Sequence, residues 1–404
     1  MVSMLSESRT GDAKRVLIVG GSTRAAARSA IRAGFQPVCA DLFADLDTRQ
    51  IAEVIAVRSY PDSLPDDVAN VRADGWFYTG ALENRPDLIE QMERPGATYG
   101  PLWGASAAAL ARIRNPFWLA ETLCRHSRLA LSVLPQAQIP PADGAWMRKP
   151  VSSAGGRAIC VWDDQALPRT SDEPIYFQER KNGTPLSALY HRSEKSLQLL
   201  GMTQQLIGHE LSHASEPFAY CGSIGPLWQG SNRSDLRERA LLTAAVEPLA
   251  SQSGLTGIFG VDFIRDECGD PWILEVNPRY TASVEILELG RKQSLLFTPD
   301  GLSAPQPEIN NQPASLIVAK MILYARQPMT APDFGALWKS TGTWDVAELA
   351  DIPVPGTRIE ATWPICTVLS SGTSEGDCLK SLQSRVDTAW KMVNHRAPQF
   401  QPQT

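Results

Sequence analysis

The stretch from Gly257 to Arg279 places the strongest constraint on how this chain folds. Two apolar runs within it flank the turn sequence ECGD at 267–270. The glycine supplies the backbone freedom that a tight turn needs, so the pattern predicts a β-hairpin. A loop of two or four residues centred on this turn places Asp262 directly opposite Glu275. A loop with an odd number of residues would not pair Asp262 with Glu275.

The side chains of this hairpin are expected to divide between two faces, because neighbouring residues of a strand point to opposite sides. Asn277 lies two residues after Glu275 and therefore shares its face. The opposite face, which can pack into a core, is expected to carry Leu274, Val276, Val261 and Phe263.

Two carboxylates that face each other across a sheet repel, and a divalent cation can compensate for this repulsion. Carboxylate and amide oxygens are ligands that suit Mg²⁺, which keeps further positions for phosphate oxygens and water. The sequence therefore predicts a metal site made of Asp262, Glu275 and Asn277, with Mn²⁺ as an alternative ion. The competing interpretation is an edge hairpin with solvated acids.

A second candidate is the segment KPVSSAGGR at 149–157, which joins two predicted strands. Its small residues allow backbone N–H groups to approach an anion closely, and Lys149 adds a positive charge. It is not a Walker A loop, because no G-K-[ST] follows four residues after a glycine. Alone, such a segment is more often a simple turn. Its position upstream of a metal hairpin favours phosphate binding, because nucleotide phosphates need both a cation and donors.

The order of predicted elements indicates a mixed α/β and α+β fold of several domains. The run RVLIVG at 15–20, a helical pattern over 25–33 and an apolar run over 37–40 form a βαβ opening. Trp76–Tyr78 and Thr98–Tyr99 are predicted strands of the same parallel sheet, and 105–126 is predicted to be helical, with Pro116 either breaking or starting a helix. We predict an N-terminal α/β domain over 14–105, a central domain over 106–300, a linker over 306–313 and a C-terminal β-rich domain over 313–394.

Composition excludes several classes of function. The net charge of -6 offers no basic footprint for nucleic acid. No stretch approaches the ~20 apolar residues of a membrane span, and the first 14 residues lack the apolar core of a signal peptide. The seven cysteines contain no C-x-x-C pair, which is typical of reduced thiols. We expect a cytoplasmic protein with small-molecule partners and without nucleic-acid or membrane partners.

Two motifs compete with this interpretation. His209-Glu210-Leu211-Ser212-His213 matches the zinc-protease pattern H-E-x-x-H, but Gly208 and Pro217 leave room for barely two helical turns.

The segment after the first predicted strand, GGSTR at 20–24, is followed by Asp41 as in a dinucleotide-binding unit, but it lacks the G-x-G-x-x-G glycines. Asp41, Asp45 and Asp47 either line a substrate site or form a solvated loop, and the loop is the favoured interpretation.

Taken together, these segments resemble the ATP-grasp superfamily, and in particular the predicted ATP-dependent carboligases related to biotin carboxylase. The resemblance rests on the lysine and Ser/Gly loop at 149–157, the hinge Phe177-Gln178-Glu179, the run GVDF at 260–263 and the run EVNPR at 275–279. It extends over most of the chain, since the N-terminal βαβ unit and the C-terminal runs AKMILYA and ICTVLSSG also resemble members of the family. The implied architecture is a pre-ATP-grasp domain, a two-subdomain ATP-grasp core and a C-terminal β-rich domain.

The resemblance implies a role for each matched residue. Lys149 and the loop of Ser152, Ser153, Gly155 and Gly156 would bind the phosphates of ATP. Glu179, with the backbone of Arg180 and Lys181, would hold adenine and ribose. Arg279 would steady an acyl phosphate. The usual upstream phosphate lysine is replaced, with Arg112 and Arg114 as the two candidates.

The activity implied is an ATP- and Mg²⁺-dependent ligase that joins a carboxylate to an amine or a thiol through an acyl phosphate. A biotin-carboxylase-like reaction and a nucleotide-binding regulatory protein without turnover are the alternatives. A homodimer is an open alternative to a monomer.

Overall fold

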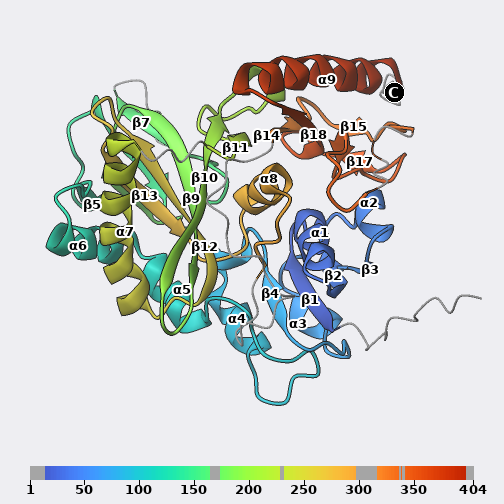
Figure 1. The fold of residues 1–404 in the computed structure, drawn as a ribbon, viewed down its shortest axis with the longest axis horizontal. Coiled ribbons are helices and arrows are strands. Elements are labelled where there is room, and N and C mark those ends of the chain that lie inside the picture. Colours follow the sequence, from blue (N-terminus) through green and yellow to red (C-terminus); the bar gives the residue numbers. More distant parts are fainter. Residues whose placement is uncertain are drawn as a thin grey trace, which may run out of the picture.

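The computed structural model describes residues 14–163, 173–227, 232–296, 316–335, 338 and 342–396. The linker predicted at 306–313 lies outside these residues. The described chain forms a four-stranded parallel sheet at its N-terminal end, an eight-stranded antiparallel sheet and a four-stranded antiparallel sheet, with helices packed between and around them (Figure 1). Its architecture is the predicted mixture of α/β and α+β structure.

The N-terminal sheet has the strand order β3-β2-β1-β4, and all its pairs are parallel. Its strands and the first helix are β1 (Arg15–Gly20), α1 (Arg24–Arg32), β2 (Gln36–Asp41), β3 (Glu53–Ala56) and β4 (Trp76–Tyr78). The apolar runs are buried on both faces, as expected for a sheet with parallel strands. The strand predicted at Thr98–Tyr99 was wrong: these residues form a turn, and Leu102 makes the isolated parallel bridge to Trp76 instead.

The largest sheet has eight strands in the order β13-β12-β9-β10-β11-β14-β18-β16. Two of its central strands were missed by the sequence pattern, β9 and β11. The bounds are β9 (Thr184–Arg192), β10 (Leu197–Ile207), β11 (Tyr220–Gly225), β12 (Gly257–Arg265), β13 (Pro271–Asn277), β14 (Ile317–Tyr324), β16 (Leu349–Ala350) and β18 (Pro364–Gly372). The C-terminal strands thus extend the same sheet that carries the hairpin. The domain boundaries proposed from the sequence stay a prediction.

A smaller antiparallel sheet with the order β5-β8-β6-β7 carries the predicted phosphate-binding segment. Its strands are β5 (Val133–Pro135), β6 (Asp143–Pro150), β7 (Cys160–Asp163) and β8 (Ile175–Glu179). Lys149 lies near the end of β6, and the Ser/Gly loop connects β6 with β7.

The longer helices flank the sheets, and α8 lies at the centre of the molecule, between the N-terminal sheet and the large sheet (Figure 1). Pro116 divides the predicted helical region into two helices, and Asn115 caps the second. The N-cap of α7 is Asn232, whose side chain accepts from the Asp235 N–H. The bounds are α4 (Pro86–Met92), α5 (Ala107–Ile113), α6 (Pro116–His126), α7 (Arg233–Ser253), α8 (Ala282–Arg291) and α9 (Glu375–Arg396).

Short elements complete the described fold: α2 (Leu46–Arg49), α3 (Leu64–Asp67), η1 (Leu82–Asn84), η2 (Glu210–Ser212), β15 (Met329–Thr330) and β17 (Arg358–Ile359).

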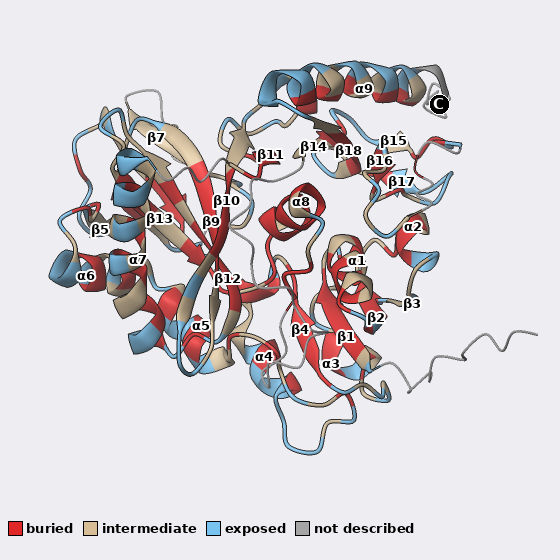
Figure 2. Ribbon diagram, in the orientation of Figure 1, coloured by how far each residue is buried: buried red, intermediate tan, exposed pale blue. Residues whose placement is uncertain are grey.

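Burial explains the central position of α8. Eight of its ten residues are buried, including Glu285 and Glu288, whereas α9 exposes one side to solvent (Figure 2). Arg24 of α1 and Lys320 of β14 form ion pairs with Glu285, and Arg32 pairs with Glu288. These partners compensate for the cost of burying charge, so α8 is fixed between the two sheets. Among the described residues, no helix is long and apolar enough to cross a membrane.

Candidate active site

The hairpin of β12 and β13 brings the predicted metal ligands together. Asp262 pairs with Glu275, and Gly260 pairs with Asn277, as the pairing argument predicted. The amide of Asn277 donates to Asp262 Oδ2 at 2.9 Å and lies 3.5 Å from Glu275 Oε1. Two carboxylates and one amide therefore share one face of the sheet.

The loop of this hairpin runs from Asp266 to Asp270, between the ends of the two strands. Its length is odd, which by itself would move Asp262 off Glu275. A register shift between Asp262 and Phe263 corrects this, because Phe263 pairs with Ile273 and Leu274 is left as a bulge. The carboxylates thus face each other through a bulge that the sequence pattern did not reveal.

The bulge also overturns one prediction about the core. Val261, Phe263 and Val276 are buried in the core, as predicted. Leu274 instead lines the cavity on the same side as Glu275, and Ile273 takes the core position. The Leu274 carbonyl accepts a hydrogen bond from Gln178 Nε2 at 3.1 Å, so the bulge is held by the neighbouring sheet.

The surroundings of Asp262 disfavour the charged form of its carboxyl group. Burial raises the pKa of Asp262 to about 6, and the charge of Glu275 acts in the same direction. The hydroxyl of Ser187 and the amide of Gln205 donate to Asp262 and partly offset these effects. A cation at this position would remove the repulsion, and the oxygen donors present suit Mg²⁺.

The donor set is an open one. Within the described part of the chain, no three His, Cys, Asp or Glu side chains converge as a metal site. Asp262 and Glu275 supply two carboxylates, and the amide oxygen of Asn277 lies 3.4 Å from Arg279 Nη2. An ion held by so few protein oxygens needs further ligands from water or phosphate, which is how Mg²⁺ is commonly bound beside nucleotides.

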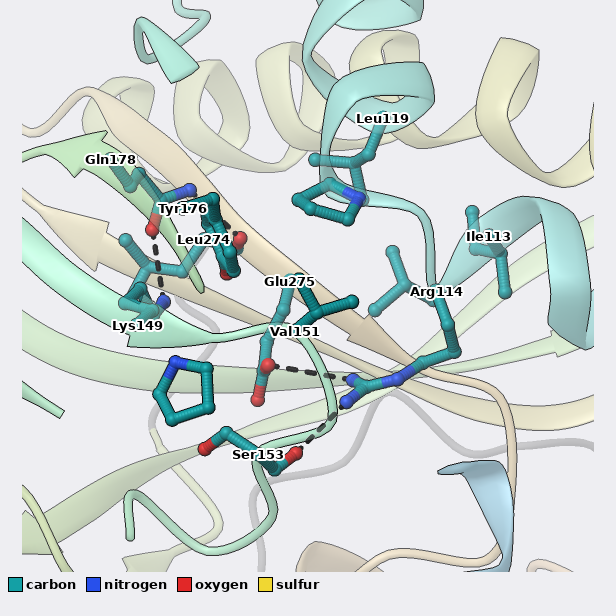
Figure 3. Close-up of a pocket in the computed structure, with 13 residues that line it drawn as sticks. Ile113, Arg114, Leu119, Lys149, Val151, Ser153, Tyr176, Gln178, Leu274 and Glu275 are labelled. Atoms are coloured by element: carbon teal, nitrogen blue, oxygen red, sulfur yellow. Dashed lines mark hydrogen bonds and ion pairs between the residues drawn. The ribbon is translucent and has the colours of Figure 1, made fainter. Parts of the chain in front are cut away.

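Lys149 is the predicted phosphate-binding cation. It is buried, and its Nζ donates to Gln178 Oε1 at 2.9 Å (Figure 3). Gln178 also holds the bulge at Leu274 through its amide nitrogen. The lysine of the small sheet and the acid pair of the large sheet are therefore linked through one glutamine.

Arg114, and not Arg112, reaches this site. Arg114 Nη1 lies 3.4 Å from Glu275 Oε2, and Nη2 donates to the carbonyl of Ser153 at 3.0 Å (Figure 3). Arg112 points elsewhere and donates to the Gln252 carbonyl at 2.8 Å on the surface. Arg114 Nε is buried without a hydrogen-bond partner among the described residues. The geometry thus distinguishes between the two candidates for the replaced lysine.

The Ser/Gly loop lies against the large sheet. The backbone N–H of Tyr220 donates to the Gly155 carbonyl at 3.0 Å. Gly156 has φ +79°, and a Cβ there would lie 1.8 Å from the Phe218 carbonyl oxygen. Only glycine fits this position, because both the backbone conformation and the close approach exclude a side chain.

A cavity of about 430 Å³ is lined by most of these groups, although not by Arg114. The predicted site residues that line it are Lys149, Ser153, Gly155, Gly156, Glu179, Arg180, Lys181, Asp262, Glu275, Asn277 and Arg279. Of the predicted set, Ser152 does not line this cavity; its carbonyl accepts a hydrogen bond from Asn84.

The predicted hinge Phe177-Gln178-Glu179 lies within β8, and the end of this strand forms another part of the cavity wall. Glu179 Oε2 accepts from the Ser132 N–H at 3.1 Å, and the Arg180 N–H is bonded to the Ala145 carbonyl. The ammonium of Lys181 lies 3.7 Å from the ring centroid of Trp272. The backbone N–H of Arg180 and the side chain of Lys181 thus already have partners within the protein. Apolar side chains, among them Met147, Ile159 and Ile264, complete a wall suited to a flat base.

Arg279 lies at another wall of the cavity and is paired with Glu83, which the sequence analysis did not identify. Arg279 Nη2 lies 2.8 Å from Glu83 Oε1, and Glu83 is almost fully buried. Although burial opposes both charges, Glu83 raises the pKa of Arg279, and Arg279 lowers the pKa of Glu83. Arg279 Nε and Glu83 Oε2 are buried without hydrogen-bond partners among the described residues.

The N-terminus of α8 also faces the cavity. Thr281, Ala282 and Ser283 line it, and the Thr281 hydroxyl is buried without a partner among the described residues. The N–H groups that begin a helix favour negative charge. Together with Arg279, this end of the cavity can hold an anion.

The competing motifs have other roles. His209 and His213 do not share a helix: they flank the short turn η2, and His213 has a left-handed backbone. Its ring stacks on Trp390 of α9, with ring centroids 4.0 Å apart. The second histidine of the H-E-x-x-H pattern therefore packs against α9.

Asp41 at the end of β2 and the following Asp45 and Asp47 are buried, so the solvated-loop interpretation was wrong. The Asp41 carboxylate accepts from the N–H and hydroxyl of Thr23, both at 2.6 Å. Asp47 accepts from the N–H groups of Asp351 and Ile352. None of Asp41, Asp45 and Asp47 lines the large cavity. These hydrogen bonds join Asp41 to the start of α1 and Asp47 to the segment at Asp351 and Ile352.

Comparison with known proteins agrees with this geometry. Residues 123–283 match the sequence model of a family described as "ATP-grasp domain". The comparison with curated proteins gave no match. Among solved structures, the L-amino acid ligase from Bacillus licheniformis is similar at 15% identity with a TM-score of 0.67, covering 93% of this chain and 97% of that one.

Biotin carboxylase from Campylobacter jejuni is similar at 12% identity with a TM-score of 0.64, covering 96% of this chain and 92% of that one. The pyruvate carboxylase of Rhizobium etli gives 13% identity and a TM-score of 0.69. That match covers 93% of this chain, which spans only 37% of the carboxylase chain. At these identities the likeness shows a shared fold.

Proposed function

We propose, from the premise that this chain is an ATP-grasp enzyme of the ligase type, that it joins a carboxylate to an amine or a thiol through an acyl phosphate. The observation that carries the proposal is the pairing of Asp262 with Glu275 beside Asn277, within a cavity that also contains Lys149. Such a site can hold a nucleotide phosphate next to a divalent cation.

The reaction has two steps. The substrate carboxylate attacks the γ-phosphorus of ATP, the bond to the β-phosphate oxygen breaks, and ADP leaves. The amine or thiol then attacks the acyl carbon, the C–O bond to phosphate breaks, and inorganic phosphate leaves. The products are an amide or thioester, ADP and phosphate, so no covalent protein nucleophile is required.

The residues around the phosphates serve mainly to position and neutralise charge. Asp262, Glu275 and Asn277 would hold Mg²⁺, which supplies positive charge beside the transferring phosphoryl group. Lys149 adds an ammonium, and Arg114 adds a guanidinium next to Glu275. The loop at 152–157 would exclude water from the acyl phosphate.

We assign the carboxylate, and the acyl phosphate formed from it, to the end of the cavity at Arg279. Arg279 Nε and the Thr281 hydroxyl are buried donors without partners among the described residues, and the N-terminus of α8 lies beside them. Groups of this kind stabilise an oxyanion because they are already oriented before the charge develops.

A biotin-carboxylase-like reaction is the second candidate within enzymes, since carboxylases are among the structural neighbours. The described cavity wall contains three carboxylates, Asp262, Glu275 and Glu179, and no histidine. The first two form the metal pair, and Glu179 is bonded to the Ser132 N–H. A carboxylase-like reaction needs a base that removes a proton from the molecule to be carboxylated. Since all three carboxylates are already engaged, the described cavity wall offers no such base, which favours the ligase.

The test is a screen for phosphate release from Mg²⁺-ATP with carboxylates offered alone and with amines or thiols. Amino acids come first, because one structural neighbour is an L-amino acid ligase. We expect release that depends on both substrates and is lost in Glu275→Gln. An unaffected rate in that variant would refute the assignment of the metal site. Tight ATP binding without release under any condition would favour the nucleotide-binding regulatory protein.

A further inference from the structure

Two consecutive residues of the N-terminal region reach opposite parts of the candidate site. Glu83 and Asn84 lie in the short turn η1, which follows β4. Glu83 binds Arg279, at the end of the cavity assigned to the acyl group. Asn84 points to the loop that covers the phosphates, and no step of the proposed reaction uses it.

Asn84 makes three contacts between separate segments. Its Nδ2 donates to the Ser152 carbonyl at 2.8 Å and lies 3.5 Å from the Ser153 carbonyl. Its Oδ1 accepts from Arg114 Nη2 at 3.2 Å. The same Nη2 of Arg114 donates to the Ser153 carbonyl at 3.0 Å. Asn84 and Arg114 thus hold the start of the loop together.

The residue before η1 has an unusual backbone conformation. Ala81 has φ +79°, a left-handed conformation that costs free energy in any residue except glycine. Such a conformation persists where surrounding contacts fix it, and here the contacts are those of Glu83 and Asn84. The second attachment of the loop is on the large sheet, where the Tyr220 N–H bonds the Gly155 carbonyl.

We propose that Asn84 is a positioning residue that couples closure of the phosphate-covering loop to the N-terminal domain. Because Glu83 precedes it, the same short turn places Arg279 at the acyl end and closes the loop at the phosphate end. The carboxylate-binding end and the cover of the phosphates would therefore assemble together. This inference rests on the proposed function, since it assigns the loop to ATP phosphates.

The consequence is protection of the acyl phosphate. A loop that closes only when η1 is in place shields the intermediate from water at the time when Arg279 is oriented to hold it. Loss of the Asn84 contacts would leave the loop open for a larger fraction of the time, while the core of the protein stays folded.

Limited proteolysis measures loop opening without any need for turnover. Arg157 is exposed at the end of the loop, so trypsin cleavage after it, followed by mass spectrometry, reports on the loop. The variants are Asn84→Ala, which removes all three contacts, and Asn84→Asp, which keeps the acceptor for Arg114 but has no donor for Ser152 and Ser153. The matched control is Arg85→Ala, because Arg85 is paired with Asp62 and Asp87 on the surface.

We expect cleavage after Arg157 to be about 3- to 10-fold faster in both Asn84 variants than in the wild type, as for the loss of one or two hydrogen bonds. Arg85→Ala should match the wild type, and the melting temperature of all three variants should stay within a few degrees. Calorimetric titration with MgADP should show weaker binding by a similar factor in the Asn84 variants, and less protection of the loop at saturation.

The outcomes separate this inference from the function on which it rests. If the wild type binds MgADP but Asn84→Ala and Asn84→Asp show unchanged cleavage and affinity, the positioning role is refuted. A general rise in cleavage across the chain, shared with Arg85→Ala, also refutes it. If the wild type binds neither MgADP nor MgATP, the proposed nucleotide site fails, whatever the loop does.

Discussion

Asp262 lies directly opposite Glu275, although the loop that connects their strands has an odd number of residues. The bulge at Leu274 restores the pairing, and Gln178 binds the carbonyl of the bulged residue. Since Gln178 also accepts from Lys149, the same side chain aligns the acid pair and the lysine. The metal and phosphate parts of the site are therefore positioned together.

Neutralising one acid of the pair should separate stability from function. In the metal-free protein, Asp262→Asn is expected to raise the free energy of unfolding by about 1–2 kcal/mol, because a partly buried charge facing Glu275 disappears. The same variant should lose stabilisation by Mg²⁺. Denaturation with EDTA and with Mg²⁺ measures both effects. Glu267→Gln on the exposed turn of the hairpin is the control, and equal behaviour of the two variants would contradict the assignment.

The two arginines at the end of α5 should differ sharply. Arg114→Ala is expected to weaken MgATP binding about tenfold, equivalent to ~1.4 kcal/mol, because it removes the guanidinium beside Glu275 and Ser153. Arg112→Ala should bind MgATP like the wild type, since Arg112 contacts only the Gln252 carbonyl among the described residues. Calorimetry of both variants provides the comparison. A larger loss in Arg112→Ala would reverse the assignment.

Gly156→Ala tests how closely the loop must approach the sheet. The added Cβ would meet the Phe218 carbonyl oxygen, and the backbone conformation disfavours alanine. We expect the loop to move away, with MgATP affinity reduced at least about tenfold and little change in melting temperature. Gly155→Ala is a useful control, because its Cβ meets no atom, although its φ of +63° is also left-handed. Equal affinities of Gly156→Ala and the wild type would refute the close approach.

Asp45 should make stability depend on pH. Burial raises the pKa of Asp45 to about 9, and the charges of Asp351, Asp47 and Asp41 act in the same direction. The unfolded pKa is about 3.9, so the folded protein binds the extra proton between about pH 4 and 9. Stability contributed by this group is therefore present at low pH and is lost as pH rises through this window.

Asp45→Asn stays neutral and should remove that slope. We expect the variant to be more stable than the wild type by about 1 kcal/mol or more at pH 8, with the two converging near pH 4. Chemical denaturation at several pH values measures the difference. Parallel curves for variant and wild type would show that Asp45 is not the titrating group.

His213→Ala tests the alternative metal motif. Loss of the stacking with Trp390 is expected to cost about 0.5–1.5 kcal/mol of unfolding free energy. Phosphate release should keep its dependence on Mg²⁺, and zinc should not replace Mg²⁺ after EDTA treatment. Elemental analysis of purified protein and an activity titration check this. Zinc bound in equal amount to the protein, and lost in the variant, would restore the zinc interpretation.

The sequence by itself determined the features that local periodicity encodes. Alternation along β13 places Glu275 and Asn277 on one face, and glycines mark the turn and the loop. The pattern also predicted the helices interrupted at Pro116 and the βαβ opening. Such features depend on residues within about ten positions of one another, so a single segment carries them.

Only the tertiary structure decided which distant segments meet. Arg112 and Arg114 are two positions apart, so they leave the end of α5 in different directions, and packing alone determines which one meets Glu275. The Glu83–Arg279 pair and the Asn84 contacts join residues far apart in sequence, and no motif marks them. The bulge at Leu274 is similar, since its carbonyl is held by another sheet. These relationships depend on burial and on long-range hydrogen bonds, which a linear pattern does not contain.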